Sequence, residues 1–370
     1  MSENILLVEP DFPIADKSRN HSHFLPIGLL KIGSYHRRLG DGVYLVRGLK
    51  ECPFTPDRVL VTSLFTYWSR QVHEATAFYH GWYPSAEIEI GGIYASLMQE
   101  DCQRRSPFAR VQVGLYRGGC AETVPLDYTI LPENLEYQII HGSRGCKRHC
   151  SFCGTWRIEP KFTYKETVLP EIQKTRLVFY DNNLLANPHI DRVLGEIATF
   201  RLRNGRSVTW ECQSGLDLRL LTAERAVLLK RSRMEYPRVA WDGPYSDWSR
   251  VKQAIQMLKA VGYGRKDIFV FMIYNHALSY VEMMKKVDAC RRWRVRIIDC
   301  RYRPLDAIED NYRFGPRPQP TGSYYIHPGW TDATVRGFRR KVRQQNIAIL
   351  LDLPRGRYIR GCEQRKVYPD

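Results

Sequence analysis

The sequence has few features of an exported or membrane protein. It contains no apolar run near the roughly 18 residues that a membrane-spanning helix needs. Residues 1–8 lack the basic region and the long apolar stretch of a signal peptide. Acidic residues are also in the minority, with 39 Asp and Glu against 56 Lys and Arg. The sequence therefore predicts a cytoplasmic protein without a membrane partner.

Familiar catalytic signatures are missing as well. The sequence has no G-x-S-x-G motif of serine hydrolases, no zinc-protease motif and no phosphate-binding loop. Of the ten cysteines, seven are scattered along the chain, which favours reduced thiols over a disulfide framework. Six of these lack metal-ligand spacing and are predicted to tolerate alanine: Cys52, Cys102, Cys212, Cys290, Cys300 and Cys362.

What the sequence does have is an excess of positive charge, +17 in all. Such a field attracts polyanions, and nucleic acid is the first candidate partner. A pocket for a small anionic substrate, or a basic composition with no specific role, is also compatible with the charge. The identity of the substrate is therefore left open by the sequence.

Three cysteines fall within eight residues, in the pattern C-x3-C-x2-C. Thiolates at Cys146, Cys150 and Cys153 can hold three irons of a cubane 4Fe-4S cluster and leave the fourth iron without a protein ligand. A structural zinc site normally needs four ligands in paired spacings, and the sequence has no second C-x2-C pair. Zinc could still recruit His149 or His141, so the alternative is a non-catalytic zinc-binding module that binds nucleic acid.

This pattern, with Phe152 just before the last cysteine, resembles the radical S-adenosylmethionine (radical SAM) superfamily. The resemblance implies that the three cysteines ligate the cluster, that the free iron chelates SAM, and that the backbone of Phe152 lies by the adenine. It also implies an enzyme, in which reductive cleavage of SAM gives a 5′-deoxyadenosyl radical that modifies an unactivated carbon. A reductant such as flavodoxin or ferredoxin would supply the electron.

Residues 1–125 alternate strands with helices, which indicates a Rossmann-like, doubly wound parallel sheet in an α/β protein. The predicted strands are 5–9, 43–46, 59–62, 86–92 and 111–115, and the predicted helices are 26–40 and 71–80. Ligands of such sheets bind at the carboxyl ends of the strands. Residues 63–66 and 91–96 are therefore expected near a ligand.

The same region also resembles the cobalamin-binding domain that precedes the radical SAM domain in many enzymes. The resemblance is carried by residues 26–30, 56–63 and 90–96, and by residues 117–122, which stand where relatives often have R-G-E-G-E. It implies a cobalamin site that includes Ser63, Thr66, Gly91, Gly92 and Ser96. The motif D-x-H-x-x-G, whose histidine ligates cobalt, is absent, so bound cobalamin should be base-off. A glycine pair after a strand is also common in turns that bind no ligand, and that alternative stays open.

Residues 126–135, in a stretch with two prolines, are predicted to link this domain to a second one at residues 136–310. Six predicted strands follow, at 137–141, 176–180, 208–212, 238–241, 268–274 and 295–300. Amphipathic helices separate them, at 190–200, 223–230, 248–261 and 280–292. These elements indicate the partial (β/α)6, TIM-type barrel expected of radical SAM domains, with active groups at the carboxyl ends of its strands.

Polar residues stand at several of these strand ends. By resemblance to cobalamin-linked radical SAM proteins, the predicted SAM contacts are Asp181, Asn182, Asn183 and Asp242, and Gln213 is added from its place at the end of the third strand. Asp242 stands where relatives often have glutamate, and its side chain is shorter by one methylene. A polar residue at a strand end is also a common helix cap or turn former, so both interpretations stay open for each residue.

Residues 311–370 are predicted to form a basic C-terminal extension with a helix whose N-cap is Thr331. Four arginines share one face of this helix and could contact the phosphates of a polyanion: Arg336, Arg339, Arg340 and Arg343. An adjacent apolar stripe, Val335, Phe338 and Val342, should pack against the barrel. A basic helix face that is simply solvated is the alternative.

Overall fold

The computed structural model describes residues 2–13, 25–132, 135–315 and 317–353. The chain divides into two compact units. The N-terminal unit comprises residues 1–182, 200–208 and 303–311, and the C-terminal unit comprises residues 183–199, 209–302 and 312–370. Cys362 and the end of the predicted C-terminal extension, residues 354–370, lie outside the described residues.

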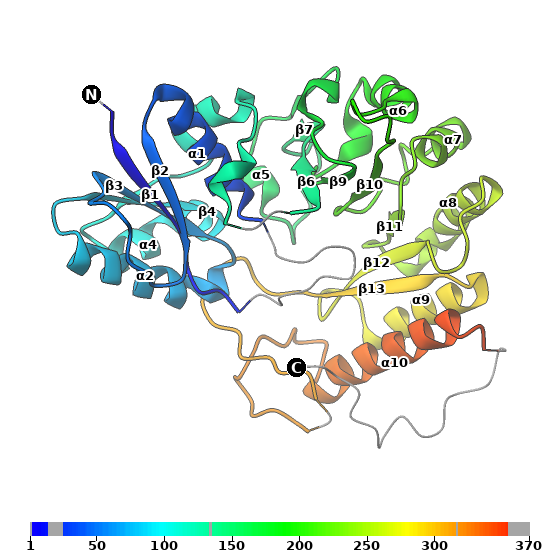
Figure 1. Cartoon of the computed structure of the whole chain (residues 1–370). Helices are drawn as coiled ribbons and strands as arrows, with labels where there is room; N and C mark the ends of the chain where they lie inside the picture. Colours follow the sequence, from blue (N-terminus) through cyan, green and yellow to red (C-terminus); the bar gives the residue numbers. More distant parts are fainter. Residues whose placement is uncertain (1, 14–24, 133–134, 316, 354–370) are drawn as a thin grey trace. The chain divides into compact units, whose positions relative to one another are not determined.

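The N-terminal unit begins with a five-stranded parallel sheet (Figure 1). The order is β2-β1-β3-β4-β5, with β1 (Asn4–Glu9), β2 (Gly42–Arg47), β3 (Arg58–Ser63), β4 (Glu87–Gly92) and β5 (Arg110–Val111). The predicted parallel sheet is confirmed. The predicted strand 111–115 is wrong over most of its length, because only Arg110–Val111 pairs with β4 and Gly114 turns the chain with a φ of +70°.

Helices cover both faces of this sheet. They are α1 (Ile27–Leu39), α2 (Ser69–Trp82), α3 (Ile93–Leu97) and α4 (Gln99–Arg105). Alternate side chains of β1 point to opposite faces, so Leu6 and Val8 pack in one core with Val72 of α2. Leu7 packs in a second core with Leu30 of α1. Burial on both faces explains why β1 is apolar at consecutive positions.

The predicted linker, residues 126–135, is packed against this unit over its described residues. It contains a 3-10 turn (η3, Tyr128–Ile130), and Ile130, Leu131 and Leu135 belong to the same buried core as α1. The backbone N–H of Asp127 also donates to Ser34 Oγ at 2.8 Å. The described residues of this segment are therefore part of the hydrophobic core of the unit. The prolines in and beside the segment do not predict this packing.

The N-terminal unit continues with a second pair of parallel strands, β6 (Tyr137–Ile140) and β9 (Arg176–Phe179). Between them lie a short antiparallel pair, β7 (Ser143–Arg144) with β8 (Thr163–Tyr164), and a short helix, α5 (Thr155–Ile158). Short 3-10 turns complete the unit: η1 (Thr66–Trp68), η2 (Tyr116–Thr123) and η4 (Leu169–Glu171).

The C-terminal unit holds four further strands. They are β10 (Thr209–Cys212), β11 (Arg238–Ala240), β12 (Phe269–Tyr274) and β13 (Arg296–Arg301). The last three form a parallel sheet in the order β11-β12-β13. Each strand lies within two residues of its predicted bounds, so the expected α/β character with parallel strands is confirmed.

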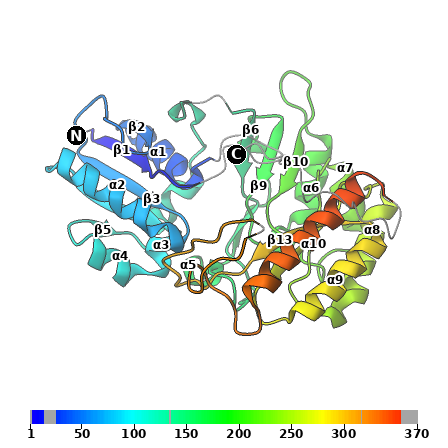
Figure 2. The same ribbon diagram turned by 90° about the horizontal axis from the view of Figure 1, so that it is seen from below.

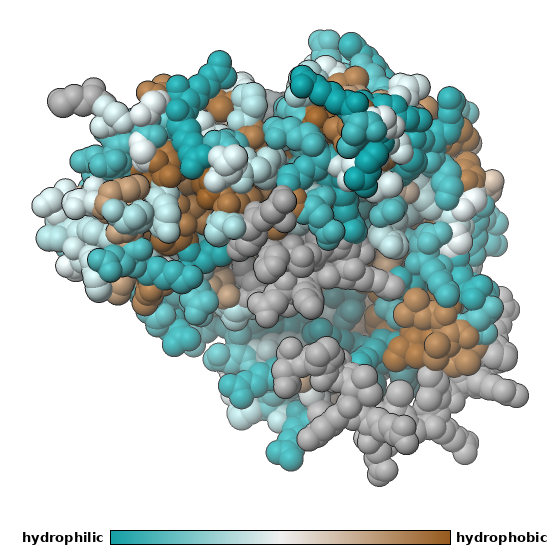
Figure 3. All heavy atoms as spheres, viewed as in Figure 1, coloured by the Kyte–Doolittle hydropathy of each residue, from teal (hydrophilic) through white to brown (hydrophobic). Residues whose placement is uncertain are grey.

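Helices of the C-terminal unit follow its strands in the predicted places. They are α6 (Ile190–Thr199), α7 (Ala223–Arg231), α8 (Trp248–Ala260), α9 (Tyr280–Trp293) and α10 (Asp332–Leu350), with the 3-10 turns η5 (Leu184–Ala186) and η6 (Tyr245–Asp247). The part of the chain that the structure describes contains no helix long and apolar enough to cross a membrane. Hydrophilic residues cover most of the face drawn in Figure 3.

The C-terminal helix α10 packs against α9 and β13 (Figure 2). Its predicted N-cap is confirmed, because Thr331 and Thr334 form a reciprocal capping box. Its apolar stripe is buried as expected, with Phe338 4.8 Å from the ring of Tyr274. Two hydrogen bonds also join α10 to β13: the side chain of Asn346 accepts from the N–H of Ile297 at 2.8 Å and donates to the carbonyl of Ile297 at 2.7 Å.

Candidate cofactor-binding site

The three clustered cysteines lie on the loop between β7 and α5, and all three are partly exposed. The loop folds on itself, because the N–H of Cys153 donates to the carbonyl of Cys150 at 3.0 Å. Trp156 Nε1 donates to the same carbonyl at 3.2 Å. These bonds hold the loop from within and leave thiols on a short, partly open segment.

Glu159 fastens the beginning of this loop. Its carboxylate accepts from Gly145 N at 3.0 Å and from Arg144 Nε at 3.0 Å, and it forms a second bond to Arg144 Nη2. Gly145 has a φ of +74°, and a Cβ there would overlap the carbonyl oxygen of Lys161. The position immediately before Cys146 therefore requires glycine.

Asp181 braces the turn that precedes the loop. Its carboxylate accepts from Gly142 N at 3.0 Å, from Ser143 Oγ at 2.7 Å and from Ser143 N. Burial raises the pKa of Asp181 to about 6, against the hydrogen bonds, which lower it. Asp181 is only 1% exposed, and its observed contacts position the turn at Gly142 and Ser143. A direct contact of Asp181 with SAM stays a prediction.

The other predicted SAM contacts are distributed between the two units. Phe152 and Asn182 belong to the N-terminal unit, where Asn182 Oδ1 accepts from Thr155 Oγ1 at 3.2 Å. In the C-terminal unit, Asn183 donates to Asp217 Oδ2 at 3.2 Å, a partner that no sequence motif had indicated. Gln213 and Asp242 are partly exposed beyond the ends of β10 and β11, and their contacts with SAM stay predictions.

A cavity of about 340 Å³ opens at the carboxyl ends of β3 and β4. All of its lining residues belong to the N-terminal unit. They come from α1, both strand ends, η2, β7 and the segments that follow β6, α5 and β9. The volume is at the lower end of the range for small-molecule sites, and the position is where doubly wound sheets bind ligands.

Three of the five predicted cobalamin-site residues line this cavity, namely Ser63, Gly91 and Gly92. Gly92 has a φ of +102°, and a Cβ there would overlap the carbonyl oxygen of Ser63, so the turn requires glycine. Thr66 and Ser96 are not among the lining residues. Their hydroxyls donate to the carbonyls of Ala307 and Gly92, at 2.6 and 2.7 Å, which indicates structural roles.

Three ion pairs form a charged wall of the cavity, made of Lys31, Glu122, Arg144 and Glu159. Glu122 pairs with Lys31 and accepts from Arg144 Nη1 at 3.1 Å, and Arg144 continues to Glu159. Burial lowers the pKa of Lys31, as does the charge of Arg144. Burial alone would raise the pKa of Glu159, but Arg144 lowers it. The wall links the cavity to the beginning of the cysteine loop.

One solved structure that superposes on the chain is of a known enzyme. The chain has the same fold as this enzyme. The neighbour is TsrM from Kitasatospora setae, a radical S-adenosylmethionine methyltransferase solved with cobalamin and a [4Fe-4S] cluster bound. The TM-score is 0.61 at 14% sequence identity, over 83% of this chain and 77% of TsrM. No family model matches the sequence, and no curated protein does.

The charged wall and His141 are the parts of the site that the sequence did not predict as ligand contacts. Residues 117–122 did carry a signal, since they stand at the R-G-E-G-E position and Glu122 is one of the two acidic residues of the wall. Lys31 and Glu159 carry no motif. His141 appeared in the sequence only as a candidate zinc ligand, whereas in the structure its ring lines the cavity.

A zinc site at the cysteine loop is not supported by the geometry. Ligands of one tetrahedral zinc lie about 4 Å or less from one another, because Zn–S bonds are near 2.3 Å. Within the described residues, the three potential ligands gathered within 4.8 Å of one another are Glu3, His36 and Asp41. Sulfurs that bind separate irons of a cubane need not be so close.

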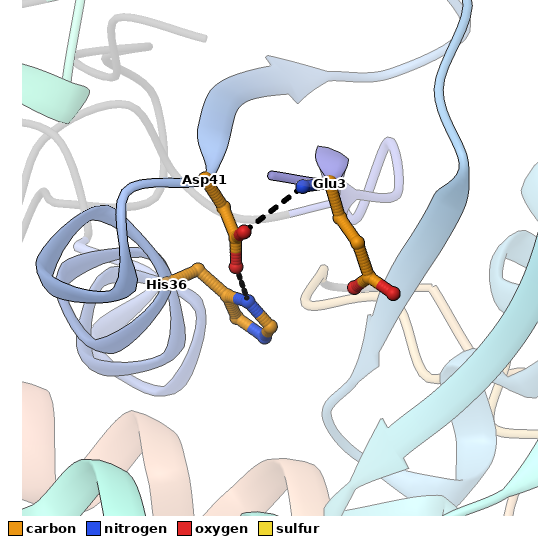
Figure 4. Close-up of side chains that lie close together, drawn as sticks. All are labelled: Glu3, His36 and Asp41. Carbon is orange, nitrogen blue, oxygen red and sulfur yellow. Dashed lines mark hydrogen bonds and ion pairs between the residues drawn. The ribbon is translucent and has the colours of Figure 1, made fainter. Parts of the chain in front are cut away.

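The group of Glu3, His36 and Asp41 is itself a hydrogen-bond network (Figure 4). Asp41 accepts from the backbone N–H of Glu3 at 3.0 Å and lies 2.7 Å from His36 Nδ1. His36 Nε2 lies 2.9 Å from the hydroxyl of Tyr116. Both ring nitrogens of the buried His36 therefore have partners, and the imidazole ties α1 to Asp41, which precedes β2, and to Tyr116.

The four predicted polyanion contacts do not share one exposed face. Arg336 is buried, and its Nη2 lies 2.7 Å from Asp332, one helical turn earlier. Arg339 stacks over the ring of Phe314 at 4.7 Å. Arg340 and Arg343 are exposed. The prediction for Arg336 as a surface contact is therefore wrong, and the i,i+4 acidic partner was the signal for it in the sequence.

Proposed function

We propose that the protein is a radical SAM enzyme whose 4Fe-4S cluster is held by Cys146, Cys150 and Cys153. The observation that carries the proposal is the C-x3-C-x2-C loop following strand β6 in a chain that has the fold of a radical SAM methyltransferase. The six strands β6 and β9 to β13 would then form the partial (β/α)6 barrel of that class of enzyme.

The residues present fit the cluster. Three partly exposed thiols lie on one loop, which is the ligand set of a cubane with an open iron. Such a cluster, when bound, would pass an electron from a flavodoxin or ferredoxin to SAM and so produce a 5′-deoxyadenosyl radical. The chain itself positions the ligands. Glu159 accepts a hydrogen bond from the backbone N–H of Gly145, the residue before Cys146, and Asp181 accepts one from the N–H of Gly142 in the preceding turn.

The cavity of the N-terminal unit is the proposed cobalamin site. TsrM holds cobalamin, and the cavity here lies at the strand ends where ligands of this fold bind. Gly91 and Gly92 present backbone without side chains at its edge. The reaction proposed is methylation of an unactivated carbon, in which bound cobalamin would carry the methyl group. The sequence lacks the D-x-H-x-x-G motif, so this chain would supply no histidine ligand from that motif.

Anaerobic reconstitution with iron and sulfide tests the proposal. The full-length wild type should take up about four irons per chain, turn brown, lose its visible absorbance with dithionite and cleave SAM. Colourless protein with stoichiometric zinc would refute it. Product analysis with candidate substrates would then decide between methyl transfer and other radical chemistry.

A further inference from the structure

His141 is a buried imidazole for which the surrounding protein provides no hydrogen bond. The residue is 7% exposed and lines the cavity. Within the described ranges, no group donates a hydrogen bond to its ring or accepts one from it. The ring nitrogens of His141 are not among the fully buried side-chain atoms that lack a partner, so they are accessible from the cavity, where a ligand or water can complete the contact.

Two other histidines of the same unit show the contrast. His73 has Ser106 Oγ 2.7 Å from Nδ1 and Tyr94 OH 3.0 Å from Nε2. His36 likewise has Asp41 and Tyr116 as partners of its two ring nitrogens. Neither His73 nor His36 lines the cavity. Of these three histidines, the one without a hydrogen-bond partner among the described residues is the one that lines the cavity.

The surroundings of His141 keep its ring neutral. Burial holds the pKa of His141 well below its ordinary value, and the positive charges of Lys31, Arg144 and Lys165 lower it further. A neutral imidazole offers one N–H donor and one acceptor nitrogen. It is therefore complementary to a group that also carries a donor and an acceptor, such as a primary carboxamide or the edge of an adenine.

The rest of the cavity favours a neutral group as well. Three carboxylates line it, those of Glu89, Glu122 and Glu159. The two lining cations, Lys31 and Arg144, are paired with Glu122 and Glu159. An anionic ligand group would lie beside these carboxylates and would have to compete for cations that are already paired, which is unfavourable.

We propose that His141 is a ligand-binding residue of the cavity, and that its imidazole hydrogen-bonds a neutral donor–acceptor group of the ligand. The inference rests on the proposed function, because a corrinoid carries carboxamide side chains and SAM carries an adenine. It adds a residue and a chemical selectivity that neither the motifs nor the fold comparison provides.

Titrations of four anaerobically reconstituted full-length proteins test this: the wild type, His141→Ala, His141→Gln and His73→Ala. The probes are hydroxocobalamin, SAM and inorganic pyrophosphate. His141→Ala should weaken binding of hydroxocobalamin or SAM, whichever occupies the cavity, by about 5- to 100-fold. His141→Gln should recover part of the loss, because an amide also has a donor and an acceptor. Pyrophosphate should not compete with either probe.

Thermal unfolding of the same proteins separates binding from structure. His141→Ala should lower the Tm less than His73→Ala does, since it removes no internal hydrogen bond of the described structure, and His73→Ala should leave the affinities within about twofold. Unchanged affinities in His141→Ala, or displacement of the probe by pyrophosphate, would overturn the proposal.

The wild type itself distinguishes the two proposals. A protein that holds its cluster but binds neither hydroxocobalamin nor SAM would overturn the role of His141 and leave the cluster assignment standing. A protein without a cluster would refute the proposed function, while the effect of His141→Ala on hydroxocobalamin affinity would still decide the role of this residue.

Discussion

At the strand ends of the N-terminal unit, paired charges line a cavity, whereas in the C-terminal unit they lie buried beneath the strand ends. In the former, the wall of Lys31, Glu122, Arg144 and Glu159 faces open space. In the latter, Arg238 pairs with Glu211 at 2.7 Å, and both side chains are less than a tenth exposed. Lys286, fully buried, donates to the carbonyls of Trp241 and Gly243 at 2.6 and 3.0 Å.

This difference separates two uses of buried charge. In the C-terminal unit the charges brace turns such as the one that carries Asp242, so changing them should alter stability. In the N-terminal unit the charges both brace the cysteine loop and form the surface that a ligand would meet, so changing them should alter stability, cluster retention and binding together.

The largest expected effect is in the N-terminal unit, at the cysteine loop. Alanine at Cys146, Cys150 or Cys153 should abolish SAM cleavage and make the cluster labile, because losing one thiolate opens a second iron, while far-UV circular dichroism stays that of the wild type. Cys300→Ala, at an exposed cysteine of the C-terminal unit, should retain iron and activity. Wild-type iron content in any of the three loop variants would contradict the cluster assignment.

Glu159→Gln should come next, because it leaves Arg144 with a weaker partner in a largely buried position. We expect a loss of about 1–3 kcal/mol in the free energy of unfolding and faster release of iron on dilution. The matched control is Glu196→Gln, which breaks the more exposed pair with Arg192 on α6 and should cost under about 0.5 kcal/mol. If denaturant titrations gave both variants the same loss in the free energy of unfolding, the ion pair of the wall would be no more stabilising than a surface pair.

Lys286→Met tests the buried charge of the C-terminal unit through pH. Burial lowers the pKa of Lys286 from 10.5 to about 8, so between these values the unfolded chain binds the extra proton. The wild-type free energy of unfolding should therefore gain about 1–3 kcal/mol from this group as the pH rises from about 8 to 10.5, and lose it again as the pH falls back through the same window.

The variant should lack this pH-dependent gain, whereas Lys252→Met, on the exposed side of α8, should retain it. Denaturant unfolding at pH 7.5, 9 and 10.5 measures the difference between the proteins. The same pH slope in Lys286→Met as in the wild type would show that this lysine is not the source.

The smallest effect is expected on the exposed part of α10. If the basic surface binds a polyanion, replacing Arg339, Arg340 and Arg343 by glutamine should lower the log–log salt slope of bulk tRNA or DNA binding by roughly two to three units. Arg336→Gln should leave the slope unchanged and lower stability, because that side chain is buried against Asp332. A slope near zero in the wild type would exclude polyanion binding by this helix.

Much of the secondary structure could be predicted because its signals are local and repeated. Strands such as β1, β3 and β12 follow from short apolar runs, and the N-cap Thr331 follows from capping chemistry within one turn. For residues 126–135, in a stretch with two prolines, the same reasoning predicted a linker but could not predict its packing, because burial of Ile130 and Leu131 depends on α1, far away in the sequence.

The sequence by itself therefore determined the order of strands and helices and the cysteine spacing, since each depends on residues close along the chain. Only the tertiary structure decided which charges meet and which polar group is left over. Lys31 and Glu122 are 91 residues apart, and a single contact of that kind leaves no period or motif to detect. The isolation of His141 is likewise a property of everything packed around it, because a missing partner can be recognised only after all neighbours are in place.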